Sequence, residues 1–411
     1  MDDVSRRTAL RAGVGAVVGL GAGVRTGRAA TTDEDDPTVA TRNCYLGADL
    51  FRLLGAAAEG PDAVRETAGD LLATVDRSRV SARLDAVAAE LARAEPDLVG
   101  IQEAALIRTG PPGGEATEVR YDFRETLLRR LAARDRPYRV VAATNGADLA
   151  VPATVAGETR TVRLTDRDLL LARAPVETSA ATADTFDATL SLSRDGREVT
   201  VERGYAVADA TVGGRRLTVC TTHLESASAE TRTAQAAELV ELLADRPDPV
   251  VLIGDINSGP GASAAAYDRL TDSFADVGDA GATCCHAADL RNPDASLDSR
   301  VDHVLVRGGL RARDVRRVGV DPAGRVTVDG DRLWPSDHAG LVATLSPEGE
   351  TPTPTATDTA ASTETEVDTV AADTDTDTDT DTPTASTGPG FGVPAALAAL
   401  LGGALAARDD D

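Results

Sequence analysis

The stretch 250–258 brings an acidic and an amide side chain to the end of an apolar run. Residues 250–253 predict a fully buried strand, which breaks at Gly254 and presents Asp255 and Asn257 at its carboxyl end. Ligands bind at that end of the strands in open α/β sheets. Because side chains alternate along an extended chain, we expect Asp255 and Asn257 to share one face. A carboxylate beside a carboxamide can polarise a water molecule and hold an oxyanion, although Gly, Asp and Asn are also common turn residues.

Five other predicted strand ends or loops carry a carboxylate, a carboxamide or an imidazole. They contain Asn43 after 39–42, Glu103 after 97–102, His223 at the end of 217–223, Asp302 at the start of 301–306, and Asp337 with His338 before 341–343. Each of these segments alone has an ordinary explanation as a turn, a cap or a solvated strand end. Their number, order and spacing together indicate one catalytic unit.

In this order the segments resemble the endonuclease/exonuclease/phosphatase superfamily, which includes DNase I, apurinic endonucleases, sphingomyelinases and inositol-polyphosphate phosphatases. The resemblance covers about residues 38–346 and implies an α/β fold, a DNase I-like four-layer sandwich of two packed β-sheets flanked by helices. Amphipathic or Ala/Leu/Glu-rich segments at 81–96, 123–134 and 231–244 are the predicted helices. No glycine-rich phosphate loop or dinucleotide-binding fingerprint is present in the sequence.

The resemblance also implies roles for the polar residues around a metal. Glu103 would bind Mg²⁺ (Mn²⁺ is an alternative), with Asn43 and Asp337 assigned to the same metal site, since Mg²⁺ takes oxygen ligands. One position departs from the apurinic endonucleases, because Tyr45 stands where they carry an acidic metal ligand. With Tyr45 at this position, the number of bound metals stays open, and the sequence here is more similar to DNase I-type and phospholipase-type members.

The remaining residues of the set would act on the phosphate. Asp255 would orient or deprotonate the attacking water, and Asn257 would hold a phosphate oxygen. His338 would act as a general acid or base or electrostatically, with Asp302 on its other ring nitrogen, and His223 would be the second imidazole near the phosphate. A degenerate copy that keeps the fold as a non-catalytic binding module is the main alternative.

Charge limits the possible partners only weakly. The net charge is −25, and every basic side chain is an arginine, a composition that suggests a halophilic archaeon. An acidic surplus speaks against a broad basic surface for nucleic acid. However, the Debye length falls to ~3 Å at about 1 M salt, so surface charge steers little in a halophile.

Both ends of the sequence predict an exported, anchored protein. Residues 1–30 combine Arg6-Arg7 with a short Gly/Ala-rich apolar run, the pattern of a twin-arginine signal peptide, although a short anchor or a basic leader is an alternative. Residues 349–388 are rich in Thr, Asp and Pro and cannot bury a core, which predicts a disordered stalk. Residues 389–411 resemble the archaeal Pro-Gly-Phe sorting signal, with an ordinary membrane anchor as the alternative.

The four cysteines favour structural roles. Cys44 and Cys220 fall in predicted strands, where a buried thiol behaves as a small hydrophobe. Cys284 and Cys285 precede His286, but no second cluster completes a zinc site in the sequence. Structural residues or one disulfide are the better interpretation, and four cysteines allow three pairings.

The sequence therefore predicts a surface-anchored, metal-dependent phosphoesterase with a monomeric catalytic domain. The expected substrate is a phosphodiester: DNA or RNA first, then a phospholipid, with a small phosphate ester as a further alternative.

Overall fold

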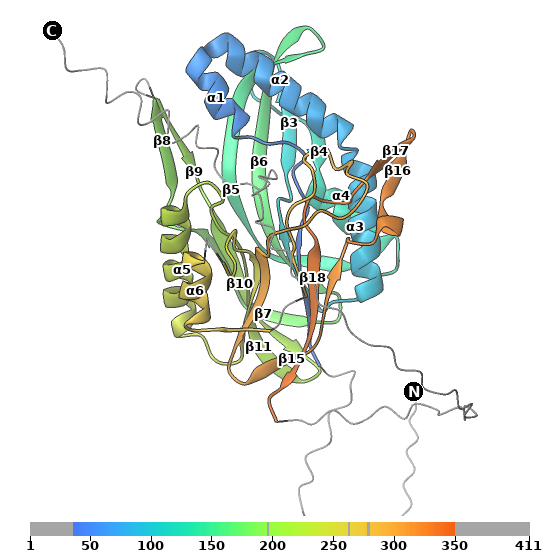
Figure 1. Ribbon diagram of the computed structural model, residues 1–411, viewed down its shortest axis with the longest axis vertical. Helices are drawn as coiled ribbons and strands as arrows, with labels where there is room; N and C mark the ends of the chain where they lie inside the picture. Colours follow the sequence, from blue (N-terminus) through green and yellow to red (C-terminus); the bar gives the residue numbers. More distant parts are fainter. Residues whose placement is uncertain (1–35, 195–196, 262–263, 278–279, 350–411) are drawn as a thin grey trace, which may run out of the picture.

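The computed structural model describes residues 36–349 except 195–196, 262–263 and 278–279. Two large sheets pack face to face, and helices cover their outer faces (Figure 1). The predicted four-layer α/β sandwich is confirmed. The predicted signal peptide, most of the stalk and the C-terminal segment lie outside the described residues. Among the residues that the structure does describe, no helix is long and apolar enough to cross a membrane.

The first sheet has eight strands, in the spatial order β15-β18-β1-β2-β6-β3-β4, and β5 pairs with β6. Their bounds are β1 Thr38–Asn43, β2 Leu98–Gln102, β3 Leu106–Gly110, β4 Glu118–Asp122, β5 Tyr138–Val155, β6 Glu158–Arg173, β15 Leu310–Val318 and β18 Gly340–Pro347. Most pairs are antiparallel, but β1 and β2 are parallel. Three helices within residues 52–94 lie between these two strands in sequence, as a parallel crossover requires.

The second sheet has six strands, in the order β13-β14-β12-β11-β10-β7. Their bounds are β7 Glu177–Thr185, β10 Gly204–Val212, β11 Arg215–His223, β12 Val250–Asp255, β13 Ala275–Asp276 and β14 Asp302–Arg307. Two small ribbons complete the strands, β8 Leu190–Arg194 with β9 Arg197–Val201, and β16 Val326–Val328 with β17 Asp331–Leu333. A short 3-10 helix occupies Pro322–Gly324.

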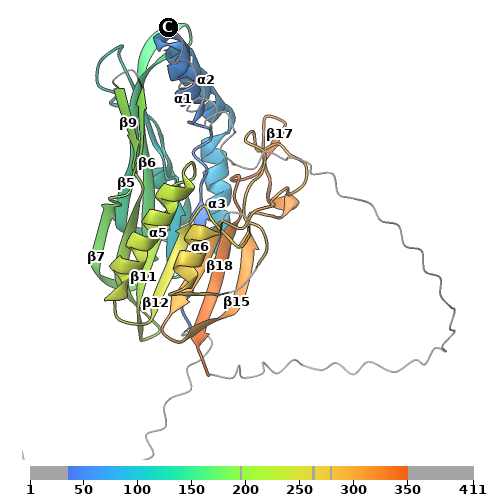
Figure 2. The ribbon, with the colours of Figure 1, turned by 60° about the vertical axis from the view of Figure 1, so that its left-hand side comes forward.

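The helices fall into two groups. Helices α1 Arg52–Glu59, α2 Pro61–Arg77, α3 Val80–Ala94 and α4 Phe123–Ala132 cover the first sheet, and α5 Ala229–Ala244 and α6 Ala265–Thr271 cover the second (Figures 1 and 2). The predicted helices correspond to α3, α4 and α5. Helix α5 begins where the Ser228 side chain accepts a hydrogen bond from the backbone N–H of Thr231 at 3.1 Å, which caps its first turn.

Three clusters of buried apolar side chains fill the spaces between the four layers. One lies between α1–α4 and the first sheet, one between the two sheets, and one between the second sheet and α5 with α6. Successive side chains of β2 point to opposite faces of the sheet, which explains this division. Val99 and Ile101 belong to the first cluster, and Leu98 belongs to the second.

The two sheets come into close contact next to the predicted site. A Cβ atom on Gly100 would lie 2.2 Å from Oγ1 of Thr221 on the opposite sheet, so only glycine allows this contact. Beside it, Nε2 of Gln102 donates to Oγ1 of Thr221 at 3.1 Å, and Oε1 of Gln102 accepts from Thr41 at 3.1 Å. These buried hydrogen bonds fix how the end of β2 faces β11.

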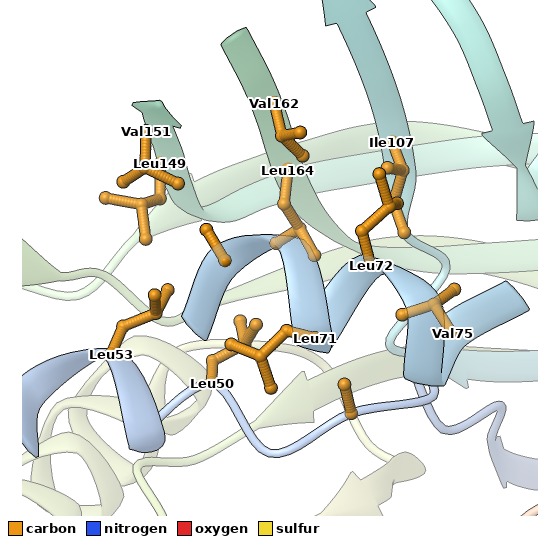
Figure 3. Close-up of a pocket in the computed structure, with 12 residues that line it drawn as sticks. Leu50, Leu53, Leu71, Leu72, Val75, Ile107, Leu149, Val151, Val162 and Leu164 are labelled. Carbon is orange, nitrogen blue, oxygen red and sulfur yellow. The ribbon is translucent and has the colours of Figure 1, made fainter. Parts of the chain in front are cut away.

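An apolar hollow lies between α1, α2 and the first sheet (Figure 3), and no predicted site residue lines it. Leu72, Val75 and Ile107 point into it, and its walls are almost entirely aliphatic. The hollow is part of the packing of α2 on the sheet and has no group that could do chemistry.

Leu72→Ala is expected to lower the free energy of unfolding by about 2–5 kcal/mol, because it removes buried methyl groups beside space that is already incompletely filled. Chemical denaturation followed by circular dichroism measures the change. Val119→Ala is the control: Val119 is 60% exposed, and its truncation should change stability by less than about 0.5 kcal/mol. Equal effects of the two substitutions would contradict the packing assigned to α2.

Candidate active site

Three neighbouring strands of the second sheet place their polar residues side by side. His223 ends β11 opposite Asp255 of the parallel strand β12, and Asp255 pairs in turn with Asp302 of the antiparallel strand β14. Residues paired in register point to the same face of a sheet. The three side chains are buried, with exposed fractions of 2% or less.

The first sheet supplies the other half of the site. Asn43 ends β1 next to Gln102 of β2, which brings Asn43 beside Glu103, the residue that follows β2. Asp337 and His338 immediately precede β18, which pairs with β1. Ser336 anchors their loop, because its Oγ donates to the carbonyl of Asn43 at 2.8 Å and accepts from the His338 N–H at 3.2 Å.

Asp255 lies at the centre of the cluster. Its Oδ2 accepts from Nδ2 of Asn43 at 3.1 Å and lies 3.7 Å from Nε2 of His223 and 3.8 Å from Nδ1 of His338. Burial opposes ionisation of Asp255, but the nearby imidazoles of His338 and His223 outweigh it and lower the pKa of this carboxyl. Asp255 therefore carries its negative charge at neutral pH.

His338 and Asp302 form a close pair. Nδ1 of His338 lies 2.9 Å from Oδ2 of Asp302, the contact expected from the sequence. Burial disfavours the charged ring, but Asp302, Asp255 and Asp337 outweigh it and raise the pKa of His338 well above its usual value. The ring is thus held protonated at neutral pH, with Nε2 free of the Asp302 contact.

Glu103, Asp337 and Asn43 have the donor chemistry of a site for a hard divalent cation. Burial raises the pKa of Asp337 to about 7, and the negative charge of Glu103 adds to the increase. A cation between these carboxylates would relieve that repulsion and displace the proton. Asn43 donates its Nδ2 to Oε1 of Glu103 at 3.1 Å, while its Oδ1 accepts the N–H of Tyr45 at 2.8 Å, so in this orientation it holds the carboxylates rather than offering an oxygen.

In the described part of the chain, two groups of three side chains place their ligand atoms within 4.8 Å of one another, and neither includes Glu103. One consists of Asp255, Asp302 and His338, and the other of Cys284, Cys285 and His338. The first group shows that a metal ion could be held on the Asp255 side of the site as well as near Glu103.

The expectation that Asp255 and Asn257 share the face of an extended segment is wrong. Strand β12 ends at Asp255, and Asn257 has φ of 49°, so the chain turns into the left-handed region there. Oδ1 of Asp255 accepts the N–H of Asn257 at 2.9 Å, the pattern of an Asx turn. Nδ2 of Asn257 donates to the carbonyl of Leu224 at 2.9 Å, which keeps the side chain at the edge of the site. The turn therefore belongs to the site, because its first residue, Asp255, lies at the centre of the cluster.

A buried charged group behind His223 was not identified from the sequence. Arg203 lies 3.1 Å from Nδ1 of His223 through Nη1 and contacts Oδ2 of Asp166 at 3.2 Å, and Oδ1 of Asp168 lies 3.7 Å from the same ring nitrogen. Burial and the charge of Arg203 disfavour the charged ring, but Asp168 and Asp255 outweigh them and raise the pKa of His223 to about 9, so the ring keeps a proton on Nε2 facing Asp255 at neutral pH. Asp166 and Asp168 alternate directly before the apolar run 169–172, a pattern like that at Asp255 that could have indicated them.

Two buried arginines hold the loops of the site in place. Arg83 of α3 donates to the carbonyls of Cys44, Tyr45 and Pro335 at 2.9–3.0 Å. Arg42 donates to the carbonyl of His338 and pairs with Glu90. Neither arginine has exposed surface, so both hold these loop carbonyls in fixed positions.

Tyr45 and the two remaining histidines, His286 and His303, have structural roles. The Tyr45 hydroxyl donates to the carbonyl of Ala288 at 2.9 Å, and burial raises its pKa, so it is not a substitute for an acidic metal ligand. His286 stacks on Trp334, and His303 packs against Tyr267, so neither imidazole is in the cluster around Asp255.

Asp302→Asn is expected to move the alkaline limb of the pH profile of kcat/KM to lower pH. The nearest negative charge that holds His338 protonated is lost, so the pKa of the ring falls and the protonated form disappears at lower pH. Initial rates measured across the neutral and alkaline range check the shift, with the exposed Asp298→Asn as control. An unchanged limb with reduced rate would show that protonated His338 is not required.

Comparison with known proteins gives a family match and several structural likenesses. Residues 68–338 match the model of the Endonuclease/Exonuclease/phosphatase family, a range that contains every predicted site residue except Asn43. The chain is similar to the solved structure of an endonuclease/exonuclease/phosphatase family protein from Leptotrichia buccalis C-1013-b, at 14% identity over 75% of this chain and 99% of that one (TM-score 0.47). Comparison with curated proteins gave no match.

Two further solved structures carry more specific descriptions. One is D. rerio TDP2 complexed with single strand DNA product, at 17% identity over 76% of this chain and 99% of that one (TM-score 0.43). The other is the mannosyl-6-phosphatase Bt3783 of Bacteroides thetaiotaomicron VPI-5482, at 14% identity over 75% and 99% (TM-score 0.45). These activities are those of the two relatives.

Proposed function

The chain belongs to the endonuclease/exonuclease/phosphatase family, and on this premise we propose that it is a metal-dependent phosphodiesterase that hydrolyses P–O bonds around Asp255. One observation carries the proposal. A buried carboxylate, lowered in pKa, is contacted by Asn43 and flanked by two imidazoles within 3.8 Å. A copy of the fold that only binds has no need to keep so many charged groups out of water, since their burial is costly.

Hydrolysis requires a water oxygen to attack phosphorus as the ester P–O bond breaks on the opposite side. Asp255, held ionised, would orient the water and receive its proton. Protonated His338 would donate to the leaving oxygen or stabilise its charge, while Asp302 holds the ring at Nδ1. The Nε2–H of His223 and the second amide hydrogen of Asn257 would contact the nonbridging phosphate oxygens, whose charge grows in the transition state.

The carboxylates of Glu103 and Asp337 fit Mg²⁺ because they offer oxygen ligands, and Glu103, which Asn43 holds in place, is only half-buried. When bound there, the metal would neutralise phosphate charge and lower the pKa of a bound water. Glu103 is held for this task by Asn43 and by the N–H of Leu46, which donates to Oε2 at 2.7 Å. Mn²⁺ has the same ligand preferences and should substitute.

DNA is the first substrate to test. An exported nuclease would degrade environmental DNA, and the acidic balance of the chain does not weigh heavily against this in molar salt, where surface repulsion is screened. RNA, phospholipids and small phosphate esters are the alternatives.

The deciding experiment incubates purified residues 31–348 with Mg²⁺ in molar salt and offers plasmid DNA, RNA, phospholipid vesicles and a phosphomonoester separately. Cleavage of plasmid DNA that stops in excess chelator supports the proposal. Cleavage of lipid or monoester alone would replace the nuclease assignment, and metal-dependent stabilisation without turnover on any substrate would favour a binding module.

We also propose that the protein is exported by the twin-arginine route and held at the cell surface by its C-terminus. The support is the sequence of residues 1–30 and 349–411. Deletion of residues 389–411 is expected to release the enzyme into the medium, and replacement of Arg6-Arg7 by lysines to retain it inside the cell. A truncated protein that still fractionates with membranes would contradict the anchor.

A further inference from the structure

A pair of adjacent cysteines forms part of the wall of the active site. Cys284 and Cys285 are joined by a disulfide, and Sγ of Cys285 lies 3.9 Å from Nε2 of His338. Both sulfur atoms and a ring nitrogen of His338 lie within 4.8 Å of one another. His286 is adjacent in sequence, but the fold instead brings the distant His338 to the sulfurs.

The position of the pair is fixed from both sides. Oγ1 of Thr283 accepts the N–H of Asp302 at 3.1 Å, and its carbonyl accepts the N–H of Ala339 at 2.7 Å. On the other side, the His286 N–H donates to the carbonyl of Asp337 at 2.8 Å. The segment 283–286 is therefore hydrogen-bonded to the residues on either side of His338. These hydrogen bonds fix the two sulfur atoms beside the His338 ring.

The ligand chemistry of this group differs from that of the Glu103 site. Two thiolates and an imidazole suit a thiophilic cation such as Zn²⁺ or Cd²⁺, whereas Mg²⁺ takes oxygen. The ring nitrogen near the sulfurs is Nε2, and Asp302 already occupies Nδ1 at 2.9 Å. A carboxylate on one ring nitrogen with a metal on the other is the usual way in which proteins orient a metal-binding histidine.

We propose that Cys284, Cys285 and His338 form a redox-controlled binding site for a thiophilic divalent cation that stops hydrolysis. In the disulfide form no thiolate is available, and His338 is free for catalysis. A dithiol reductant supplies two electrons and two protons, the S–S bond breaks to give two thiols, and the reductant becomes a disulfide. Both thiols and Nε2 of His338 then release their protons to solvent as the cation binds, and the two thiolates and Nε2 become its three ligands.

The cation would inhibit by removing His338 from the reaction, and this part rests on the proposed function. Binding itself does not, because it depends only on the two sulfurs and the ring. Cys285 is partly exposed, so a cation and a small reductant can reach the pair from the site. The remaining cysteines, Cys44 and Cys220, are buried and free, and they are too deep to compete in the folded protein.

The test uses the full-length protein in its disulfide form and after treatment with a dithiol reductant that is then removed without oxygen. Cd²⁺ is titrated into each while the ultraviolet charge-transfer band of the Cd–thiolate bond is recorded. Reduced protein should bind one Cd²⁺ per chain, and oxidised protein should show no band. Alkylation followed by mass spectrometry of the 284–285 peptide confirms which form is present.

Variants separate this site from other cysteines and from the Glu103 site. Cys285→Ser should lose the band, Cys220→Ser should keep it, and His338→Asn should weaken Cd²⁺ binding about 10- to 100-fold. Cd²⁺ can also inhibit by displacing Mg²⁺, and its effect on the oxidised protein measures that contribution. At the same Cd²⁺ concentration, the reduced protein should lose at least about tenfold more activity than the oxidised protein.

Three results would overturn the inference: a band of equal strength in the oxidised protein, a band retained in Cys285→Ser, or reduced protein that binds no Cd²⁺. If Cd²⁺ binds as expected but no form of the protein hydrolyses any phosphoester, the proposed function fails while the metal site stands.

Discussion

Replacing Asp255 by Asn is expected to lower kcat by about 10³-fold while the protein stays folded. The amide has nearly the same size and can still accept the N–H of Asn257, so the turn after β12 is preserved. It cannot carry charge or receive a proton, and its Nδ2 would face the Nδ2 of Asn43 as a second donor. The loss should appear in kcat more than in KM, because water activation is needed in the transition state.

Steady-state kinetics on the substrate that the native protein cleaves, with thermal unfolding as the folding check, measures this effect. Asp245→Asn is the matched control, since Asp245 is exposed at the end of α5 and remote from the site. A rate for Asp255→Asn within about tenfold of native would show that this carboxylate does not take part in the chemistry.

Much of the fold and site could be predicted because the informative signals are local. Apolar runs that end in a polar residue predict where strands stop, and the carboxyl ends of neighbouring strands meet at one edge of a sheet. His223, Asp255 and Asp302 illustrate this, because register alone places them side by side once β11, β12 and β14 are neighbours. The pairing of Asp302 with His338 followed from chemical role and from the resemblance.

The features that could not be predicted depend on contacts between distant segments. Arg83 lies on an amphipathic helix, where an arginine is normally solvated, yet it binds the carbonyls of two loops. Arg203 contacts His223 only because β10 and β11 pair, and Cys285 meets His338 only through the folding of the 283–286 segment. A turn at Asn257 was the alternative interpretation of the same residues, and the left-handed φ of Asn257 supports the turn and not the extended segment.

Glu103→Gln is expected to reduce hydrolysis about 10²-fold or more and to remove most of the stabilisation by Mg²⁺. Saturation of the native protein at about 100 times Kd would add about 2.7 kcal/mol to the free energy of unfolding. The amide keeps one oxygen but loses the charge that attracts the cation. Thermal unfolding with and without Mg²⁺ therefore reports on the metal site even if no substrate is yet known.

The same substitution has two opposing effects on the metal-free protein: it relieves the crowding of carboxylates, but its amide nitrogen replaces an oxygen that accepts from Asn43 or from the N–H of Leu46. Glu103 contributes to the raised pKa of Asp337, so neutralising Glu103 should lower that pKa and relieve repulsion in the absence of metal. Glu158→Gln, at an exposed position at the start of β6, is the control and should retain both activity and the Mg²⁺ response. Full activity of the native protein in excess chelator would contradict the metal requirement itself. An unaltered Mg²⁺ response in Glu103→Gln would instead move the metal to the cluster of Asp255, Asp302 and His338, whose ligand atoms are also close enough to share one ion.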